Sequence, residues 1–558
     1  MLRSAYDLSF YEFDDERDLQ VYEVFLCDLV HGKPPMKPLY LGIGWYWYVS
    51  AIAYAAETLH LPTTKGWGYR VVDGYLYLTA RRTTPEEAKA REPIFRERIK
   101  PFIENFGGMW DAYKKELLEL YKNAKESRNL REWADIRKLT NSELLQFFLD
   151  FAFVINRKEA EIHFIMMIPS CYINGLFQQM WYEIFGRNAS IDPEFNKLVT
   201  GFENQDIRIF RILWQLSRKA VALGLEDIFK SENYEEILKE LEKTDTGKRW
   251  LKEFKEFLIE HGWRCERMHA YDTFAWIEKP SLAIGPVKQL MNQDSFTFDV
   301  ERERIVRERE KLENEIINKV PFEQRDWFRV LLRAAQTTGY FSEDHSYYCD
   351  LYVGAMGRWI VTELGRRFAE AGCIDTPEDI HFLHTNEIRK VAVQLDANLR
   401  PYVERRKKEW ERSCKLDPPP FIGNIEKAEE VLRSDPTLLI STQRPVIREE
   451  LKADLYGAAA APGIVEGIAR VIMSADRLSE VKKGEILVAP GTSTAWTAVF
   501  NLIKGLITDG GGSLSHPVIM AREYGIPCVS GCLEATKKIK TGMKVRIDGD
   551  LGVVYILK

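Results

Sequence analysis

The chain has 558 residues and a net charge of −6, with 78 Lys and Arg against 84 Asp and Glu. This length predicts about three to four domains, with ample material for a large hydrophobic core. The slightly acidic balance lacks a polybasic tract, which excludes nucleic acid and anionic membrane surfaces as main partners.

The cysteines and the apolar runs indicate a cytoplasmic protein. The eight cysteines form no Cys-x-x-Cys pair and no zinc-like spacing with histidine, so we expect reduced thiols. Residues 1–13, MLRSAYDLSFYEF, lack the apolar core of a signal peptide. FIMMIPSCYINGLF at 164–177 is too short for a membrane span and is interrupted by Pro169. We expect it to form a buried helix or a pocket wall.

Near the N-terminus, the sequence predicts an aromatic core and a β-hairpin. GWYWYVSAIAY at 44–54 carries aromatic residues at helical spacing, which indicates core packing or a flat pocket for an aromatic ligand. VVDGYLYLT at 71–79 alternates like a strand that is entered from an Asp-Gly turn.

From about residue 85 to 440 the pattern is helical, because apolar residues return every three or four positions. The run at 350–372 ends at Gly372, a natural helix C-cap. VERERIVRERE at 300–310 predicts a helix with a solvated charged face.

After residue 455 the pattern changes to short β-branched strands, glycine turns and two helices. The predicted fold is therefore a large, mostly α-helical domain at 1–436, a linker at 437–455 and a small α/β domain at 456–558. The polar linker suits a mobile domain, since about 15 extended residues span roughly 50 Å.

A glycine-rich turn precedes His516 in the stretch TDGGGSLSHPVIMAREYGIPCVSG at 508–531. Gly511 and Gly512 let the backbone approach an anion, and Ser515 can cap the helix that follows. The N–H groups at the start of that helix favour a phosphate, and a neutral imidazole is a competent nucleophile towards phosphorus. The pattern predicts that His516 carries phosphate, although a glycine turn before a capped helix is the simpler alternative.

This stretch resembles the phosphohistidine swivelling domain of the phosphoenolpyruvate-utilising family. The resemblance extends to 458–472, 484–493 and 542–557. Leu514 and Pro517 depart from the usual pattern, and the leucine removes a hydroxyl beside the nucleophile. The matching positions are Thr508, Gly511, Gly512, Ser515, His516, Ala521, Arg522, Glu523, Gly525, Ile526 and Pro527.

The resemblance implies how the histidine is charged and discharged. In this family an ATP-grasp module transfers phosphate from ATP, but no segment of this chain resembles that module. The pyruvate barrel of the family also has no counterpart after His516. We therefore expect a separate ATP-grasp subunit that binds ATP with Mg²⁺ or Mn²⁺, and we do not expect pyruvate chemistry.

The helical part resembles the substrate domain of rifampicin phosphotransferase and the large subunit of phenylphosphate synthase. Residues 31–39 with 73–78, 261–281 and 371–388 carry this resemblance. It implies transfer of phosphate to the hydroxyl of a small aromatic substrate such as phenol, with ATP converted to AMP and phosphate. One alternative acceptor is a larger natural product or antibiotic. Another alternative is a phosphocarrier that passes phosphate to a second protein.

Candidate acceptor-site residues cluster in GYFSEDHSYYCDLYVGAMGRW at 339–359. His345 is a candidate general base with Asp344 or Glu343 orienting it, and Arg358 is a candidate ligand of the phosphoryl group. Asp344 and Tyr347 are candidate substrate contacts. The alternatives are a capping or solvated histidine and a helix ion pair for the arginine.

Arg522 lies seven residues after Ser515, two turns along the same predicted helix face. It is a candidate phosphate ligand, and an ion pair with a neighbouring carboxylate is the alternative.

Overall fold

A computed structural model describes two compact units. The first comprises residues 1–172, 267–273 and 348–442, and the second comprises 173–266, 274–347 and 443–558. Much of the helical region thus groups with the C-terminal domain. The described residues are 22–28, 35–130, 132–189, 192–265, 271–291, 298–435, 437–438, 449–492, 494–511 and 516–557. Of the predicted linker at 437–455, residues 439–448 lie outside them.

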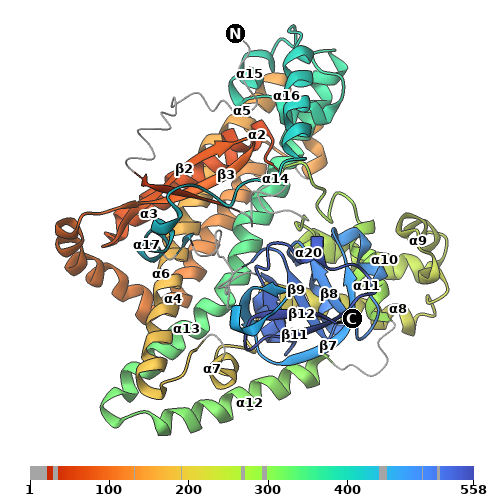
Figure 1. Cartoon of the computed structure of the whole chain (residues 1–558). Helices are drawn as coiled ribbons and strands as arrows, with labels where there is room; N and C mark the ends of the chain where they lie inside the picture. Colours follow the sequence, from red (N-terminus) through yellow and green to blue (C-terminus); the bar gives the residue numbers. More distant parts are fainter. Residues whose placement is uncertain are drawn as a thin grey trace. The chain divides into compact units, whose positions relative to one another are not determined.

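A four-stranded antiparallel sheet lies in the first unit, and its strands follow the order β2-β3-β1-β4. Figure 1 labels β2 and β3 of this sheet. Asp73 and Gly74 both have positive φ, at 49° and 76°, as a tight two-residue hairpin turn requires. The predicted Asp-Gly hairpin is confirmed. The strands are β1 (Val24–Cys27), β2 (Thr64–Val72), β3 (Tyr75–Arg82) and β4 (Phe421–Gly423).

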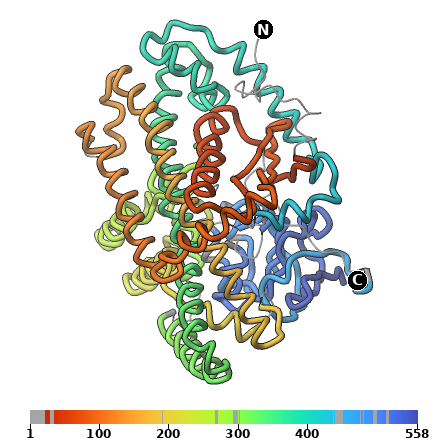
Figure 2. The backbone as a smooth tube through the Cα atoms, turned by 90° about the vertical axis from the view of Figure 1, so that its left-hand side faces the viewer, coloured from red at the N-terminus to blue at the C-terminus, as the bar shows by residue number. Residues whose placement is uncertain are grey.

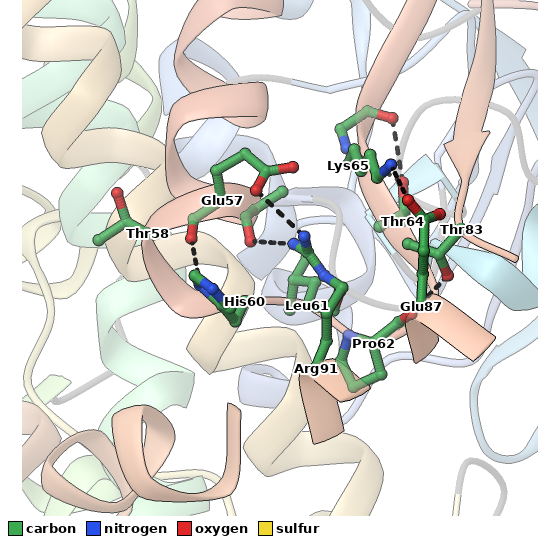
Figure 3. Close-up of polar contacts among 12 residues, drawn as sticks. Glu57, Thr58, His60, Leu61, Pro62, Thr64, Lys65, Thr83, Glu87 and Arg91 are labelled. Atoms are coloured by element: carbon green, nitrogen blue, oxygen red, sulfur yellow. Dashed lines mark hydrogen bonds and ion pairs between the residues drawn. The ribbon is translucent and has the colours of Figure 1, made fainter. Parts of the chain in front are cut away.

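Helix α4 (Pro85–Glu126) begins against the corner between α3 (Tyr46–Leu59) and β2, as Figure 3 shows. Lys65 on β2 forms an ion pair of 2.6 Å with Glu87 in the first turn of α4. Arg91, one turn further on, donates through Nε at 2.7 Å to a backbone carbonyl just after α3. These contacts attach the start of α4 to the sheet.

The other helices of the first unit include π-helical turns directly before α3, α6 and α14. Such turns are rare and occur frequently at functional sites. Helix α14 is followed by Gly372 at φ 76°, which confirms the predicted C-cap. The elements are α2 (Pro38–Tyr40), η1 (Leu41–Trp45), η2 (Trp133–Lys138), α5 (Asn141–Asp150), η3 (Phe151–Ile155), α6 (Asn156–Phe185), η6 (Ser346–Leu351), α14 (Tyr352–Glu370), η7 (Pro377–Phe382), α15 (Thr385–Val391), α16 (Arg400–Ser413), η8 (Ile425–Lys427) and α17 (Ala428–Ser434).

The second unit contains the later part of α6 and a further set of helices. Among these, α12 and α13 are joined by the short turn η5, and Figure 2 follows this run in green. Within the described residues, no helix is long and apolar enough to cross a membrane. The helices are α7 (Pro193–Leu198), α8 (Gln205–Ala222), η4 (Ile228–Lys230), α9 (Tyr234–Leu241), α10 (Asp245–His261), α11 (Ser281–Met291), α12 (Phe298–Lys319), η5 (Phe322–Gln324) and α13 (Arg325–His345).

The C-terminal domain has an eight-stranded mixed sheet in the order β5-β12-β11-β7-β8-β9-β10-β6. Strands β7 to β10 are parallel, and their β-branched side chains form a buried core with those of β11 and β12. A mostly helical region followed by a small α/β domain is the predicted fold class. The elements are η9 (Glu449–Leu451), β5 (Leu455–Tyr456), β6 (Ala458–Ala461), β7 (Ile464–Val471), η10 (Ala475–Glu480), β8 (Ile486–Ala489), η11 (Thr494–Asn501), β9 (Gly505–Thr508), α19 (His516–Glu523), β10 (Cys528–Ser530), α20 (Ala535–Lys538), β11 (Lys544–Asp548) and β12 (Val553–Leu557).

Candidate functional site

His516 is the first residue of helix α19, which connects the parallel strands β9 and β10. Ligand sites in such β-α-β units lie at the carboxyl ends of the strands, where the helix N-terminus points. The backbone of His516 therefore occupies a position suited to phosphate. Gly512 and Ser515 lie outside the described residues, as does the side chain of His516.

The structure describes the glycine turn as far as Gly511, and this part is hydrogen-bonded to the end of β10. Gly511 has φ 114°, a conformation that glycine adopts readily. Ser530 Oγ donates to the Gly511 carbonyl at 2.9 Å and lies 2.9 Å from Thr508 Oγ1. Asp509 Oδ1 accepts the N–H of Thr536 at 2.9 Å. These contacts fix the chain that leads to His516.

Arg522 lies near the other end of α19. Its Nε donates to the carbonyl of Ala460 on β6 at 2.8 Å. Loss of water around the partly buried guanidinium lowers the pKa of Arg522 to about 10, so it remains charged at neutral pH. A role in phosphate binding stays a prediction.

A cavity of about 520 Å³ lies in the second unit beside the C-terminal end of α19. Its charged lining is dominated by cations, which makes it suitable for anions. The pocket is far from His516 along the helix, since seven residues of α-helix span about 10 Å. The charged side chains that line it are Lys197, Arg302, Arg304, Glu308, Arg309, Arg522 and Glu523.

Two arginines of the charged helix α12 point inward. Arg302 pairs with Glu523 at 2.8 Å, and Arg309 donates to the carbonyl of Gly201 at 2.9 Å. Each side chain is only 11% exposed. The prediction of a solvated charged face is therefore wrong for Arg302 and Arg309. Their guanidinium groups lie against a carboxylate and backbone carbonyls instead of water.

Four of the candidate acceptor residues lie in the second unit and have structural partners there. Asp344 accepts the backbone N–H of Gln205 at 2.8 Å and thereby stabilises the start of α8. The Tyr347 hydroxyl donates to the carbonyl of Glu260 at 2.9 Å. Glu343 belongs to a buried cluster with the Asp206–Arg264 ion pair, where burial and Asp206 raise the pKa of its carboxyl.

His345 is the last residue of α13 and is buried. Its Nδ1 lies 3.1 Å from the carbonyl of Phe341, and its ring stacks on the Phe341 ring at 4.9 Å. The solvated alternative is thus excluded, while its role as a base stays a prediction.

Arg358 belongs to the first unit, on α14. It is 2% exposed and donates from Nη1 to the carbonyl of Tyr271 at 3.1 Å. This contact is made to a backbone carbonyl and is not an ion pair along the helix. His345 and Arg358 are close in sequence but fall in different units.

A buried cluster in the first unit was not predicted from the sequence. The Tyr48 hydroxyl lies 2.7 Å from Asp350 Oδ1 and 3.0 Å from Glu159 Oε1. His163 Nδ1 lies 3.2 Å from the same Asp350 oxygen. Burial and the neighbouring Asp350 raise the pKa of the Glu159 carboxyl. The Tyr48 hydroxyl has one proton and can donate it to only one of the two carboxylates at a time. The other carboxylate can therefore bind another proton or a cation.

Cys349 completes a possible ligand set in this cluster. One ligating atom each of Glu159, His163 and Cys349 lies within 4.8 Å of the others, and all three residues are buried. Oxygen, imidazole nitrogen and thiolate sulfur are the ligands that Zn²⁺ prefers. Cysteine spacing does not reveal this set, because it contains only one cysteine, and Cys349 lies 190 residues after Glu159.

Two segments of the chain match known protein families. Residues 481–552 match the family described as PEP-utilising enzyme, mobile domain, and this match includes all of α19. Residues 163–343 match the rifampicin phosphotransferase fourth domain.

Full-length comparisons find relatives that are longer than this chain. The uncharacterized phosphotransferase YvkC of Bacillus subtilis is 29% identical over 443 residues, covering 77% of this chain and 51% of YvkC. Rifampicin phosphotransferase of Bacillus subtilis is 30% identical over 342 residues, covering 59% and 36%. Chondramide synthase cmdD of Chondromyces crocatus is 26% identical over 561 residues, covering 98% and 14%. The chain thus spans about half or less of the length of these curated relatives.

Proposed function

We propose that this chain is a phosphotransferase that carries phosphate on His516 and delivers it to a hydroxyl group of a natural product. The matches of two segments to the PEP-utilising mobile domain and to the rifampicin phosphotransferase fourth domain support this proposal. The observation that carries this proposal is the start of α19 at His516, directly after a glycine turn and inside the matched mobile domain.

The proposed chemistry has two half-reactions at His516. In charging, the neutral imidazole attacks the β-phosphorus of ATP, the bond between this phosphorus and AMP breaks, and the outer phosphate is then lost to water. The N-terminus of α19 stabilises the phosphate that remains on the histidine. In transfer, the N–P bond breaks, an O–P bond forms to the acceptor, and the hydroxyl proton passes to a base. Gly511, Gly512 and Ser515 are the proposed phosphate ligands, with Arg522 as a further candidate.

The acceptor is proposed to be a larger natural product rather than phenol. Two of the relatives carry names that refer to such compounds, rifampicin phosphotransferase and chondramide synthase. No relative reported above is named for phenol phosphorylation. Phenol therefore becomes one member of the acceptor panel in the test below.

Charging is proposed to come from an ATP-grasp subunit with ATP and Mg²⁺ or Mn²⁺, because the divalent ion neutralises the triphosphate. This subunit would release AMP and phosphate as the histidine is charged. Mg²⁺ and Mn²⁺ belong to the nucleotide in this scheme and not to the present chain.

The test is transfer of label from the β-phosphate of ATP, with the ATP-grasp subunit present. We expect label on the chain that survives alkali and is lost in acid, as a phosphohistidine requires. The variant His516→Ala should take up no label. His60→Asn is the matched control, since Asn tolerates the left-handed backbone of this residue and His60 lies in the first unit. Undiminished label in His516→Ala would contradict the proposal. Adding rifampicin-like polyketides, cyclic depsipeptides and phenol to the charged chain then identifies the acceptor.

A further inference from the structure

We propose that Glu159, His163 and Cys349 form a binding site for a divalent transition-metal ion of the zinc class. The proposal does not depend on the proposed phosphate transfer at His516. Three observations support the site: the chemistry of the donor atoms, a buried oxygen without a hydrogen-bond partner, and the neighbouring polar groups.

The donor set has the chemistry of a zinc site. Carboxylate oxygen, imidazole nitrogen and cysteine sulfur lie within 4.8 Å of one another. Glu159 and His163 are four residues apart on α6, so their side chains share one helix face. Cys349 comes from the π-helical segment η6, far away in sequence. Three protein ligands are the usual number in zinc sites that keep a fourth position open.

Glu159 has an oxygen that the protein leaves unused. Its residue is 0% exposed, and Oε1 accepts from the Tyr48 hydroxyl. Across the described parts of the chain, Glu159 Oε2 has no hydrogen-bond partner. A buried carboxylate oxygen without a partner is strongly unfavourable, and coordination to a cation removes this penalty.

Two neighbouring polar groups, Asp350 and Tyr48, lie beside the proposed ligands. His163 Nδ1 lies 3.2 Å from Asp350 Oδ1 and 3.8 Å from Glu159 Oε1, so the imidazole ring lies beside both carboxylates. The Tyr48 hydroxyl bridges the carboxylates of Asp350 and Glu159.

The backbone around the cluster also points to a site. The π-helical turn η3 (Phe151–Ile155) ends four residues before Glu159, and η6 (Ser346–Leu351) contains both Cys349 and Asp350. Turns of this type widen the helix and change the direction in which its side chains point. They frequently occur at functional sites.

Metal content of the whole purified chain tests the proposal without ATP or any acceptor. The chain is treated with chelator, reconstituted with Zn²⁺, desalted and analysed by mass spectrometry for metals. We expect about one Zn²⁺ per chain, consistent with a single three-ligand site. Replacement by Co²⁺ should give visible d–d absorption and a near-ultraviolet sulfur-to-cobalt band. A wild-type chain that retains no metal and gives no cobalt spectrum overturns the proposal, and the cluster then holds a proton instead.

Single variants assign the ligands. Glu159→Gln and His163→Gln should weaken Zn²⁺ binding about 10-fold or more, and Cys349→Ser should abolish the sulfur-to-cobalt band. Cys171→Ser is the matched control, since Cys171 is also buried in the first unit on α6 but lies outside the ligand set. Circular dichroism establishes that each variant is folded. A sulfur-to-cobalt band that persists in folded Cys349→Ser, or disappears in Cys171→Ser, contradicts the assignment.

Discussion

Glu523 accepts a hydrogen bond from Arg302 Nη1 at 2.8 Å, and the two side chains are 6% and 11% exposed. Both carboxylate oxygens also lie 3.2 Å from the backbone N–H of Gly201. Glu523 is the last residue of α19, the helix that begins at His516. In the second unit, the contact with Arg302 on α12 therefore fixes the far end of the helix that carries the proposed phosphate.

The first prediction follows from this pair. Arg302→Gln leaves a nearly buried carboxylate without its cation, a loss of about 3–5 kcal/mol for a buried pair. We expect normal charging of His516 and slower transfer to the acceptor, because the mobile domain loses this docking contact. The two half-reactions are separated by charging first, removing ATP, and then adding acceptor.

Arg304→Gln is the control for this experiment, because Arg304 lies on the same helix with a side chain 52% exposed. The double variant Arg302→Glu with Glu523→Arg should recover part of the transfer rate. Equal transfer rates in Arg302→Gln, Arg304→Gln and the wild type would refute the docking role.

A second prediction concerns the acceptor site. His345→Ala should leave charging intact and slow transfer by about 10²-fold or more, the scale of a lost general base. Its ring is buried against Phe341, so thermal unfolding is measured alongside to separate catalysis from stability. Transfer at the wild-type rate would show that His345 is a packing residue.

A third prediction tests Arg358 in the same assay. Arg358→Ala should also spare charging and impair transfer, because the guanidinium would no longer hold the phosphoryl oxygens. Arg358→Lys keeps the positive charge and serves as the paired variant, although it lacks the planar fork. If the loss of transfer rate in Arg358→Ala equals the loss of folded protein, the main role of Arg358 is its structural contact with the Tyr271 carbonyl.

The fourth prediction is a pH dependence set by His261. Its Nδ1 lies 3.0 Å from Gln205 Nε2, and burial lowers the pKa of His261 to about 4. The unfolded chain has a histidine pKa of about 6.5 and binds the proton first as the pH falls. The contribution of His261 to the free energy of unfolding is therefore fully present above about pH 6.5. It decreases by about 3 kcal/mol in total as the pH falls to about 4.

Urea unfolding at several pH values measures this loss. We expect His261→Gln to flatten the decrease between about pH 6.5 and pH 4, since glutamine does not titrate. His60→Asn, which changes a histidine of the first unit, should retain the wild-type slope. Parallel curves for wild type and His261→Gln would show that another group causes the acid sensitivity.

A fifth prediction is that this chain alone takes no label from ATP in the presence of Mg²⁺, because no segment resembles an ATP-grasp module. Isothermal calorimetry should detect no tight ATP binding, and labelling should require the added subunit. Self-labelling without a partner would show that the described chain contains a nucleotide site of another type.

The sequence alone determined the features that depend on neighbouring residues. The turn at Asp73 and Gly74, the helix end before Gly372 and the helix start at His516 each depend on backbone preferences within a few positions. The change from helical to strand periodicity near residue 455 likewise located the α/β domain.

Only the tertiary structure decided which polar side chains meet in the interior. Glu159 lies 111 positions after Tyr48, and Asp350 lies 302 positions after Tyr48. Nothing in the local sequence marks these three residues as neighbours. The same holds for Arg302, whose partner Glu523 is distant from it in sequence. Its inward direction follows from the packing of α12 against two separate segments, one that contains Gly201 and one that contains Glu523. Periodicity reports which face of an element is apolar, whereas the partner of a buried charge is set by packing between distant segments.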